Sequence, residues 1–276
     1  MEYSIRELED MAKEMRLNIV KMIGVGKTGH IGGSCSIADV VTVLYFYKMN
    51  IDPKDAKWED RDRFVMSKGH AALAQYAALS KLGFFAEEEL AKLKKLGAVL
   101  QGHPDMAATP GIEANTGSLG QGLSIACGMA AGAKLDKKEY KVYCVVGDGE
   151  MGEGQIWEAG MAAAHHKLDN LTVILDRNGI QAMGPTAKRL DSGPLEDKWR
   201  AFGWHVIVID GHSIEQIIDA LEESDHVTGK PTMIIADTIK GKGICFAENT
   251  AVYHNGAMTK EQYELACIDL CSKEEV

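Results

Sequence analysis

The sequence has few cysteines and no long apolar run, and each shortage excludes a class of protein. Six cysteines are spread over 276 residues without a Cys-x-x-Cys pair, far below the density of a disulfide scaffold. No run approaches the roughly 18–20 apolar residues of a membrane helix, and Glu2 stands where a signal peptide would be basic. We therefore expect reduced, mostly buried thiols and a cytoplasmic protein that makes no use of a membrane.

Positive charge is also in short supply. The 30 Lys and Arg residues against 40 Asp and Glu give a formal net charge of −10. A field of this sign repels phosphate backbones, so nucleic acid is not expected as a partner. Repeats, low-complexity tracts and long linkers are absent from the sequence. The length and the 46% hydrophobic fraction fit a single domain over residues 1–276.

Glycine is what the sequence has in excess, with 29 residues and a fraction above the usual ~7%. The glycines cluster beside His, Asp and Asn, which suggests backbone that closely approaches a ligand. One cluster, residues 24–29, matches G-x-G-x-x-G and the end of a Walker A loop. It follows an amphipathic helix and not a strand, and Lys21 stands where a P-loop needs Gly. We therefore do not interpret it as a nucleotide-binding motif.

The hydrophobic pattern predicts the fold class. Apolar residues at helical spacing predict helices over 4–23, 36–49, 69–82, 86–96, 123–134, 153–166, 194–202 and 213–224. Short β-branched runs predict buried strands over 64–66, 141–146, 171–175, 205–209 and 232–236. Ser36 is a candidate N-cap. Strands that alternate with helices predict a doubly wound α/β fold, with a mainly parallel sheet and helices on both faces.

Two of the predicted strands end in oxygen-bearing side chains flanked by glycine. Asp148 lies in Gly-Asp-Gly-Glu after one strand, and Asn178 lies in Asp-Arg-Asn-Gly-Ile after the next. Their oxygens are hard ligands suited to Mg²⁺ or Ca²⁺, and the glycines leave space for a diphosphate. Either motif alone could be an ordinary turn. Together, each closing a strand, they favour a metal and diphosphate site.

Histidines form a second pattern, because His30, His70 and His103 each lie in a glycine-rich loop. A loop imidazole can hydrogen-bond a polyol or transfer protons near neutral pH. Lys68 beside His70 suits an anionic group. One such histidine alone could be a turn or core residue, but three in similar settings favour a functional site.

A third pattern is Asn-Thr-Gly-Ser-Leu-Gly-Gln-Gly at residues 115–122, which leads into the alanine-rich helix expected over 123–134. A helix N-terminus with free amides and little side-chain bulk suits an anion or a closely docked cofactor. Tight helix packing, with Thr116 or Ser118 as a cap, is the alternative.

Together these motifs resemble the N-terminal, diphosphate-binding region of transketolase, a thiamine-diphosphate enzyme. The resemblance spans nearly the whole chain. It is carried by segments 29–30, 62–70, 102–104, 116–122, 147–154, 176–180, 202–205, 210–212, 240–243 and 254–257. The family usually has Asn at the position of Arg177, a difference that leaves Asn178 in place.

The resemblance implies a site for thiamine diphosphate and Mg²⁺, which Ca²⁺ or Mn²⁺ could replace. The implied metal ligands are Asp148, Asn178 and the carbonyl oxygen of Ile180. The residues implied to contact or surround the cofactor are Gly33, Lys68, His70, Gly117, Ser118, Leu119, Gly147, Gly149, Glu153, Asn178, Lys242 and His254.

The resemblance also implies catalytic histidines. His30, His70, His103 and His254 would face the substrate hydroxyls as hydrogen-bond donors and acid/base groups. Glu153 is similar to the acidic residue that couples paired active sites across a dimer. The other histidines are expected to be mostly surface or core groups, and these are His165, His166, His205, His212 and His226.

Transketolases continue into a pyrimidine-binding domain and a C-terminal domain, which this sequence does not contain. The glutamate that activates the cofactor and the groups that anchor the sugar phosphate lie in those domains. The resemblance therefore implies one half of a split transketolase, which is inactive without a C-terminal subunit. The two would assemble as a heterotetramer with two copies of each. The expected reaction moves a two-carbon ketol unit from xylulose 5-phosphate to ribose 5-phosphate in the pentose phosphate pathway.

Three alternatives stay open. The chain could be half of a related enzyme, such as a deoxyxylulose-phosphate synthase or a transketolase for an unusual sugar. It could be a non-catalytic thiamine-diphosphate-binding protein, although such a protein has no need of His30 or His103. An NAD-dependent oxidoreductase is a third class, but it needs a strand before its glycine motif, and this sequence has a helix there.

Overall fold

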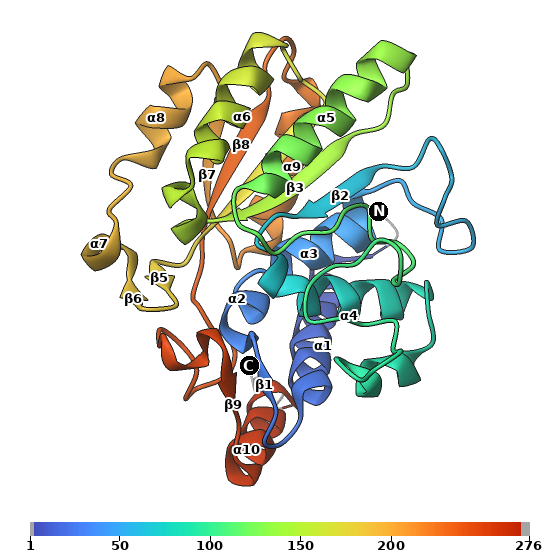
Figure 1. Cartoon of the computed structure of the whole chain (residues 1–276), viewed down its shortest axis with the longest axis vertical. Coiled ribbons are helices and arrows are strands. Elements are labelled where there is room, and N and C mark those ends of the chain that lie inside the picture. The colour runs from blue at the N-terminus through green and yellow to red at the C-terminus, as the bar shows by residue number, and fades with distance from the viewer. Residues whose placement is uncertain (1–2, 272–276) are drawn as a thin grey trace.

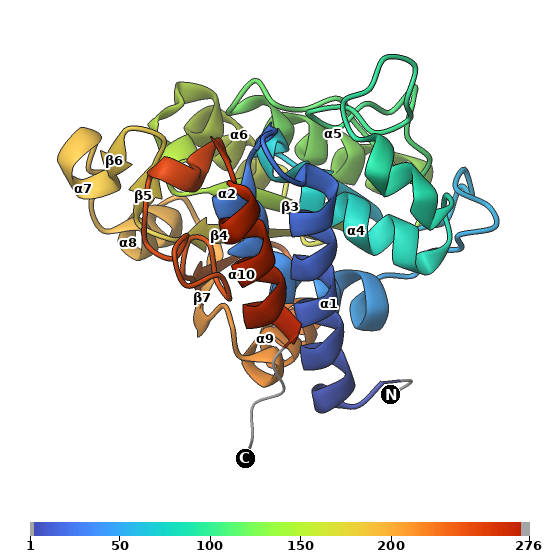
Figure 2. The ribbon, with the colours of Figure 1, turned by 90° about the horizontal axis from the view of Figure 1, so that it is seen from below.

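The computed structural model describes residues 3–271, and its centre is a five-stranded parallel sheet (Figures 1 and 2). All neighbouring strands in this sheet run in the same direction. The strands lie in the order β2 (Arg63–Met66), β3 (Val142–Gly147), β4 (Leu171–Arg177), β8 (Thr232–Asp237) and β7 (His205–Asp210). All five strands predicted from the sequence are therefore confirmed.

Helices cover both faces of the sheet, and each face has its own apolar core. Successive strand residues point to opposite faces. On β3, Tyr143 and Val145 belong to one core, whereas Val142 and Cys144 belong to the other. The first core includes residues of α1 (Ile5–Ile23), α3 (Ala38–Val43), α4 (Ala72–Leu82) and α9 (Ile214–His226). The second includes residues of α5 (Gln121–Asp136), α6 (Gly154–His165) and α8 (Leu195–Ala201).

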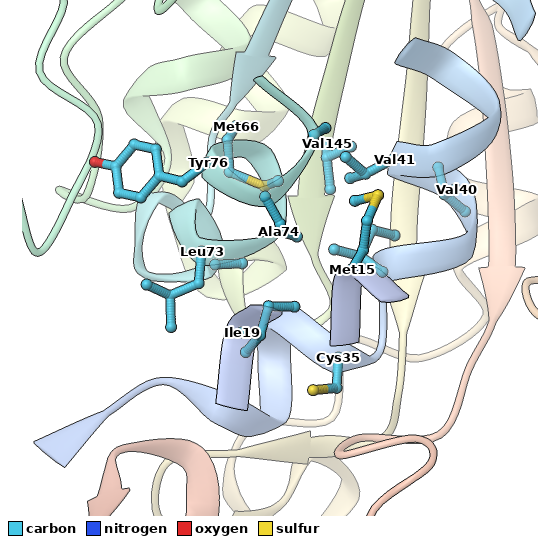
Figure 3. Close-up of a cluster of buried hydrophobic side chains, with 14 of the residues drawn as sticks. Met15, Ile19, Cys35, Val40, Val41, Met66, Leu73, Ala74, Tyr76 and Val145 are labelled. Carbon is cyan, nitrogen blue, oxygen red and sulfur yellow. The ribbon is translucent and has the colours of Figure 1, made fainter. Parts of the chain in front are cut away.

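Figure 3 shows the first core in detail, where Met15 of α1 points toward Val41 of α3 and Val145 of β3, and Ile19 of α1 lies on the side of Leu73 and Ala74 of α4. Side chains from a helix pair and from the sheet thus fill one continuous apolar layer. The doubly wound α/β class predicted from the sequence is confirmed by this arrangement.

Local signals explain where the longest helix begins and ends. Ser4 accepts a hydrogen bond from the Glu7 amide at 3.3 Å, and the Glu7 carboxylate accepts one from the Ser4 amide at 2.7 Å. This reciprocal capping box satisfies amides that the first helical turn leaves free. The helix stops at Gly24, whose φ of 68° favours glycine.

The strand order places the ends of three strands together. The chain passes from β2 to β3 and β4, continues to β7 at the far edge, and returns to β8 between β4 and β7. Because the strands are parallel, the carboxyl ends of β3, β4 and β8 share one edge of the sheet. Ligands in folds of this kind bind at that edge.

Smaller elements complete the chain. Strand β1 (Thr28–Gly29) pairs with β9 (Gly256–Ala257), and α10 (Lys260–Cys271) lies beside α1 in Figure 2. Sequence periodicity did not predict α10, whose buried residues are only Ala266 and Leu270. The other short elements are α2 (Ile31–Cys35), β5 (Ile180–Gln181), β6 (Gly184–Pro185), α7 (Thr186–Arg189), the π-helix η1 (Leu44–Lys48) and the 3₁₀ helices η2 (Gly69–Ala71), η3 (Glu87–Lys92), η4 (Gly149–Gly152) and η5 (Val252–His254).

The helix predicted over 36–49 is interrupted, and Ser36 is not its N-cap. Ser36 ends α2, and α3 begins at Ala38 and continues into η1. The Ser36 hydroxyl donates to Asp176 at 2.7 Å instead of capping a helix. The Ser36 hydroxyl thus binds the buried carboxylate of Asp176, which is distant in the sequence, in place of a helix amide.

The helix predicted over 86–96 is wrong. The structure has only the 3₁₀ helix η3, followed by turns. Leu90 and Leu93 are buried, but Leu96 is fully exposed, so the segment has too small an apolar face to hold a longer helix against the core. Lys94 then adopts a positive φ of 60° and donates its amide to Leu100.

The thiols are free, and most of them lie in or against an apolar core. Cys35, Cys127 and Cys144 are buried, whereas Cys245 and Cys271 are exposed. Cys267 is partly buried and packs against the first core, so four of the six cysteines lie in or against a core, as expected. Between residues 3 and 271, no helix is both long and apolar enough to cross a membrane.

Candidate functional site

A cavity of about 180 Å³ opens where β3, β4 and β8 end. Its walls combine strand-end residues with loops from distant parts of the chain. The lining residues are Gly33, Lys68, His70, Leu119, Gly147, Asp148, Gly149, Glu150, Asn178, Ile180, Gln181, Ala182, Lys240 and His254. Most of the residues that the sequence assigned to a cofactor or metal therefore share one cavity.

The three residues proposed as metal ligands are linked by a tight loop. Asp148 is 5% exposed, and its carboxylate accepts hydrogen bonds from the amides of Gly149 at 2.7 Å and Gly179 at 2.6 Å. The Asn178 amide oxygen accepts from the Ile180 amide at 3.1 Å. The loop after β4 is thus folded around Asp148, and all three proposed ligands line the cavity.

The electrostatics of Asp148 suit a cation. Burial raises the pKa of Asp148, and the nearby Asp176 carboxylate raises it further, while backbone amides and Lys240 act in the opposite direction. A carboxylate whose charge is disfavoured by burial gains most when a cation binds beside it. Carboxylate, amide and carbonyl oxygens are also the donors that Mg²⁺ and Ca²⁺ prefer. The residues present therefore fit a hard divalent cation.

Asp176 is the structural centre beneath the cavity, a role that the sequence did not predict. The carboxylate is fully buried and accepts hydrogen bonds from the side chains of Ser36, Lys68, Asn178 and Thr238. Burial by itself raises the pKa of Asp176, but the Lys68 ammonium and the hydrogen bonds outweigh it and lower the pKa. An ionised Asp176 therefore holds Lys68 and Asn178 in place.

Of the two lysines in the Lys-Gly-Lys-Gly segment, Lys240 and not Lys242 reaches the cavity. Lys240 Nζ donates to the Ile180 carbonyl oxygen at 2.6 Å and lies 2.9 Å from His254 Nδ1. Burial and the neighbouring Lys68 lower the pKa of Lys240 to about 8. Lys242 is not among the lining residues. Between them, Gly241 has a φ of 80° and donates its amide to Gly32, so the chain turns there.

Four histidines meet at the mouth of this cavity. The ring centroids of His70 and His254 are 4.9 Å apart, and His30 lies 5.2 Å from His70 and 5.5 Å from His254. His103 is 6.0 Å from His30. These residues come from four separate segments of the chain. The structure therefore brings together all four histidines that the sequence assigned to catalysis, and we refer to them as the histidine cluster.

The histidine cluster is neutral at physiological pH. Burial is the main cause that lowers the pKa of His30 and His254 to about 4 and that of His70 to about 2, with nearby lysines adding to it. Burial and Lys94 also lower the pKa of His103. A neutral imidazole offers one hydrogen-bond donor and one acceptor. The cluster can therefore hydrogen-bond a ligand that carries several hydroxyl groups.

Two glycines allow the histidines to lie this close to the backbone. A Cβ on Gly117 would be 2.5 Å from Cδ2 of His103, and Gly117 has a φ of 130°. A Cβ on Gly33 would be 3.3 Å from Nε2 of His70. Any larger residue at Gly117 would therefore displace the His103 ring.

The glycine-rich loop before α5 is tied to the sheet by Glu150. This buried carboxylate accepts hydrogen bonds from the Gly120 amide at 2.8 Å and from the Ser67 hydroxyl at 2.6 Å. Leu119 lines the cavity, whereas Gly117 and Ser118 do not. The N-cap of α5 is Gly120, so neither Thr116 nor Ser118 caps the helix.

Glu153 lies apart from the cavity. It is the exposed N-cap of α6 and sits close to Gly120, where an added Cβ would be 2.7 Å from the Glu153 Cβ. A role of Glu153 in coupling two active sites stays a prediction.

Arg177 does not line the cavity either. Its guanidinium binds Asp237 at 2.8 Å and also pairs with Glu196.

This chain belongs to the transketolase family. Residues 8–271 match the family model described as transketolase, thiamine diphosphate binding domain. The chain is 46% identical over 264 residues to the 6-deoxy-6-sulfo-D-fructose transketolase subunit SqwG of Clostridium sp. (strain MSTE9), covering 96% of each protein. It is 45% identical over 262 residues to one of the apulose-4-phosphate transketolase subunits of Phocaeicola vulgatus, covering 95% of this chain and 93% of that protein.

Solved transketolases share the fold. The transketolase of Campylobacter jejuni subsp. jejuni NCTC 11168 superposes with a TM-score of 0.92 at 31% identity, over 99% of this chain. The match covers 44% of that protein, so this chain spans less than half the length of the solved enzyme. The fold and the thiamine-diphosphate-binding domain expected from the resemblance are therefore confirmed.

Proposed function

We propose that this chain is the thiamine-diphosphate-binding subunit of a two-subunit transketolase. The observation that carries the proposal is the placement of the histidine cluster at the mouth of a cavity that is also lined by Asp148, Asn178 and Ile180. A protein that only stored the cofactor would need the oxygen donors but not His30 and His103, which do not line the cavity. Their placement favours catalysis on a polyhydroxylated substrate.

Each group in the cavity has a role in this proposal. Asp148, Asn178 and the Ile180 carbonyl would hold Mg²⁺, while Lys240 and His254 would contact the diphosphate. Bound thiamine diphosphate supplies the electron sink for breaking and forming a carbon–carbon bond. The histidine cluster would orient the sugar hydroxyls and accept or donate their protons. Lys68 lines the cavity, and the ion pair with Asp176 holds its ammonium group in place there.

The relatives favour an unusual sugar as the substrate. The two named subunits of similar length act, by their names, on 6-deoxy-6-sulfo-D-fructose and on apulose 4-phosphate. The expectation of xylulose 5-phosphate and the pentose phosphate pathway is less well supported than the alternative of a transketolase for an unusual sugar. Both named sugars carry an anionic group, so we propose a ketose with a sulfonate or phosphate.

The proposal requires a second chain. Relatives of this length are named as subunits, whereas the solved transketolase is more than twice as long. A partner with the pyrimidine-binding and C-terminal domains would complete each site. We propose a heterotetramer with two copies of each subunit.

The experiment is reconstitution. The purified chain is mixed with a C-terminal transketolase subunit, and ketol transfer is assayed with 6-deoxy-6-sulfo-D-fructose, apulose 4-phosphate and xylulose 5-phosphate as donors. We expect turnover only with both subunits, thiamine diphosphate and Mg²⁺, and a higher kcat/KM for one of the first two sugars. Turnover by the chain alone would contradict the split enzyme. A preference for xylulose 5-phosphate would contradict the unusual sugar.

A further inference from the structure

His212 lies outside the cavity, between a buried ion pair and the segment that leads to Lys240. It follows β7 in the turn before α9. Its Nδ1 is 2.7 Å from a carboxylate oxygen of Asp39 on α3, and its Nε2 is 2.8 Å from the backbone nitrogen of Ile239. One imidazole therefore connects a helix of the first core to the backbone beside the cavity.

The chemistry of the two contacts fixes the tautomer of His212. The Ile239 amide can only donate, so Nε2 must carry a lone pair. The ring proton then lies on Nδ1 and is donated to Asp39. The other tautomer, or a doubly protonated ring, would place an N–H against the Ile239 N–H.

Asp39, which accepts the His212 proton, is itself fixed in position by Arg16. Arg16 of α1 binds both oxygens of Asp39, with Nη1 to Oδ1 at 2.9 Å, and its Nε donates to the Cys35 carbonyl at 3.2 Å. Burial by itself raises the pKa of Asp39, but the Arg16 charge and the hydrogen bonds from His212 and Arg16 outweigh it and lower the pKa to about 2. The acceptor of the His212 proton is thus a buried, ionised carboxylate.

The other end of the His212 bridge is next to the site. Ile239 lies between Thr238, whose hydroxyl donates to Asp176, and Lys240, whose ammonium donates to the Ile180 carbonyl. The Ile239 amide between these two side chains is held by His212. The backbone from which Lys240 extends is therefore fixed through His212 to the core.

We propose that His212 is a positioning residue, which holds the 238–240 backbone so that Lys240 points into the cavity and thereby sets the affinity for the diphosphate. The inference rests on the proposed function, because it takes the cavity as the diphosphate site. His212 itself does not line the cavity.

A matched pair of variants separates the two contacts of His212. The amide oxygen of Gln reaches about as far as Nε2, so His212→Gln keeps an acceptor for the Ile239 amide. The shorter amide of Asn reaches about as far as Nδ1, so His212→Asn keeps the donor to Asp39 and loses the Ile239 contact. Each variant keeps one of the two hydrogen bonds, and thermal denaturation of both checks that they fold.

The binding test uses thiamine diphosphate, and separately inorganic pyrophosphate, in the presence of Mg²⁺, titrated calorimetrically into the full chain mixed with a C-terminal transketolase subunit. We expect His212→Asn to weaken binding about tenfold, as for a lost hydrogen bond that orients a charged group, and His212→Gln to stay within about threefold of the wild type. In a Lys240→Met background, His212→Asn should have little further effect, because the two residues act together. Equal losses for Asn and Gln, or a full loss in the Lys240→Met background, would overturn the inference.

A second measurement does not depend on the cofactor. Hydrogen exchange at the Ile239 amide should be faster in His212→Asn than in the wild type, and close to the wild type in His212→Gln. Unchanged exchange in His212→Asn would show that His212 does not hold this backbone. If the wild-type chain mixed with the second subunit binds neither probe with Mg²⁺, the proposed function fails and the link to diphosphate affinity fails with it, whatever the exchange rates are.

Discussion

Two buried aspartates lie at neighbouring strand ends but have opposite electrostatic environments. Asp176 faces the Lys68 ammonium, whereas burial and the charge of Asp176 disfavour the ionised form of Asp148. The Asp176 carboxylate forms an ion pair within the fold and so stabilises it. The Asp148 carboxylate has no such ion pair, so its negative charge is available to a metal ion. The two positions should therefore respond differently to the loss of charge.

Asp148→Asn should weaken metal-dependent cofactor binding much more than it affects the apo fold. We expect the affinity for thiamine diphosphate with Mg²⁺ to fall at least ~10–100-fold, because a metal ligand is weakened. The melting temperature without cofactor should change less than in Asp176→Asn, because losing the unfavourable buried charge offsets the one backbone hydrogen bond that Asn cannot accept. Calorimetry and thermal denaturation measure the two quantities. Asp197→Asn, at a side chain that is 76% exposed, is the control.

Asp176→Asn should instead destabilise the chain. The change leaves the Lys68 ammonium buried without its counter-charge, which typically costs about 3–5 kcal/mol of the free energy of unfolding. Urea denaturation in the absence of cofactor measures this. A variant as stable as the wild type would contradict the structural role of Asp176.

The histidine cluster predicts a pH dependence of stability. His30 has a folded-state pKa of about 4, below its unfolded value, so the unfolded chain binds more protons between these two values. The free energy of unfolding should therefore fall as the pH is lowered from about 6.5 to about 4. His30→Asn should reduce the slope, measured by urea denaturation across this range, and His226→Asn on α9 serves as the comparison. An unchanged slope in His30→Asn would contradict the buried, neutral His30.

At the scale of elements, the loop before α5 controls the position of His103. Gly117→Ala would place a methyl group against the ring and force a residue with a side chain to adopt a φ of 130°. We expect a lower kcat/KM in the reconstituted enzyme. Gly128→Ala, in the middle of α5 with open space around it, should instead stabilise the helix by roughly 0.5–1 kcal/mol. Equal activity in the two variants would contradict the close approach of Gly117 to His103.

The elements that the sequence predicted correctly are those whose pattern is local. Strands β3, β4 and β8 are short, mostly apolar runs that are buried along almost their whole length, and such runs have few alternatives in an α/β chain. The metal-ligand candidates Asp148 and Asn178 are the first residues after β3 and β4, so the sequence pattern that predicts the strands also places these two residues. The segment 86–96 has an equally local helical pattern, but tertiary packing buries only Leu90 and Leu93 and leaves Leu96 in solvent.

Other site residues depend on contacts that no local pattern reveals. Asp176 and Ser36 are 140 residues apart and meet only in the folded chain. Lys240 and Lys242 look alike in Lys-Gly-Lys-Gly, and only the backbone turn at Gly241 decides which one enters the cavity. His212 shows no sign of its two partners in its neighbouring sequence.

At the scale of the whole molecule, exposed apolar side chains occur in chain segments that carry or adjoin residues of the histidine cluster. Val252 is 71% exposed and lies two residues before His254, and Val25 is 48% exposed in the segment bridged to Met258. The proposed second subunit has to close over this cluster to exclude water from the reaction. We therefore expect these side chains to be covered in the assembled enzyme.

Val252→Asp should then weaken assembly, because a buried, unpaired charge would lie in the contact with the second subunit. Leu135→Asp, at the 82% exposed side chain near the far end of α5, is the matched control and should leave assembly unchanged. Sedimentation of each variant with the second subunit measures the assembly, and circular dichroism checks the fold. If both variants assemble as well as the wild type, the second subunit does not cover the mouth of the cavity at Val252. If both fail alike, the contact lies elsewhere or extends around the whole chain.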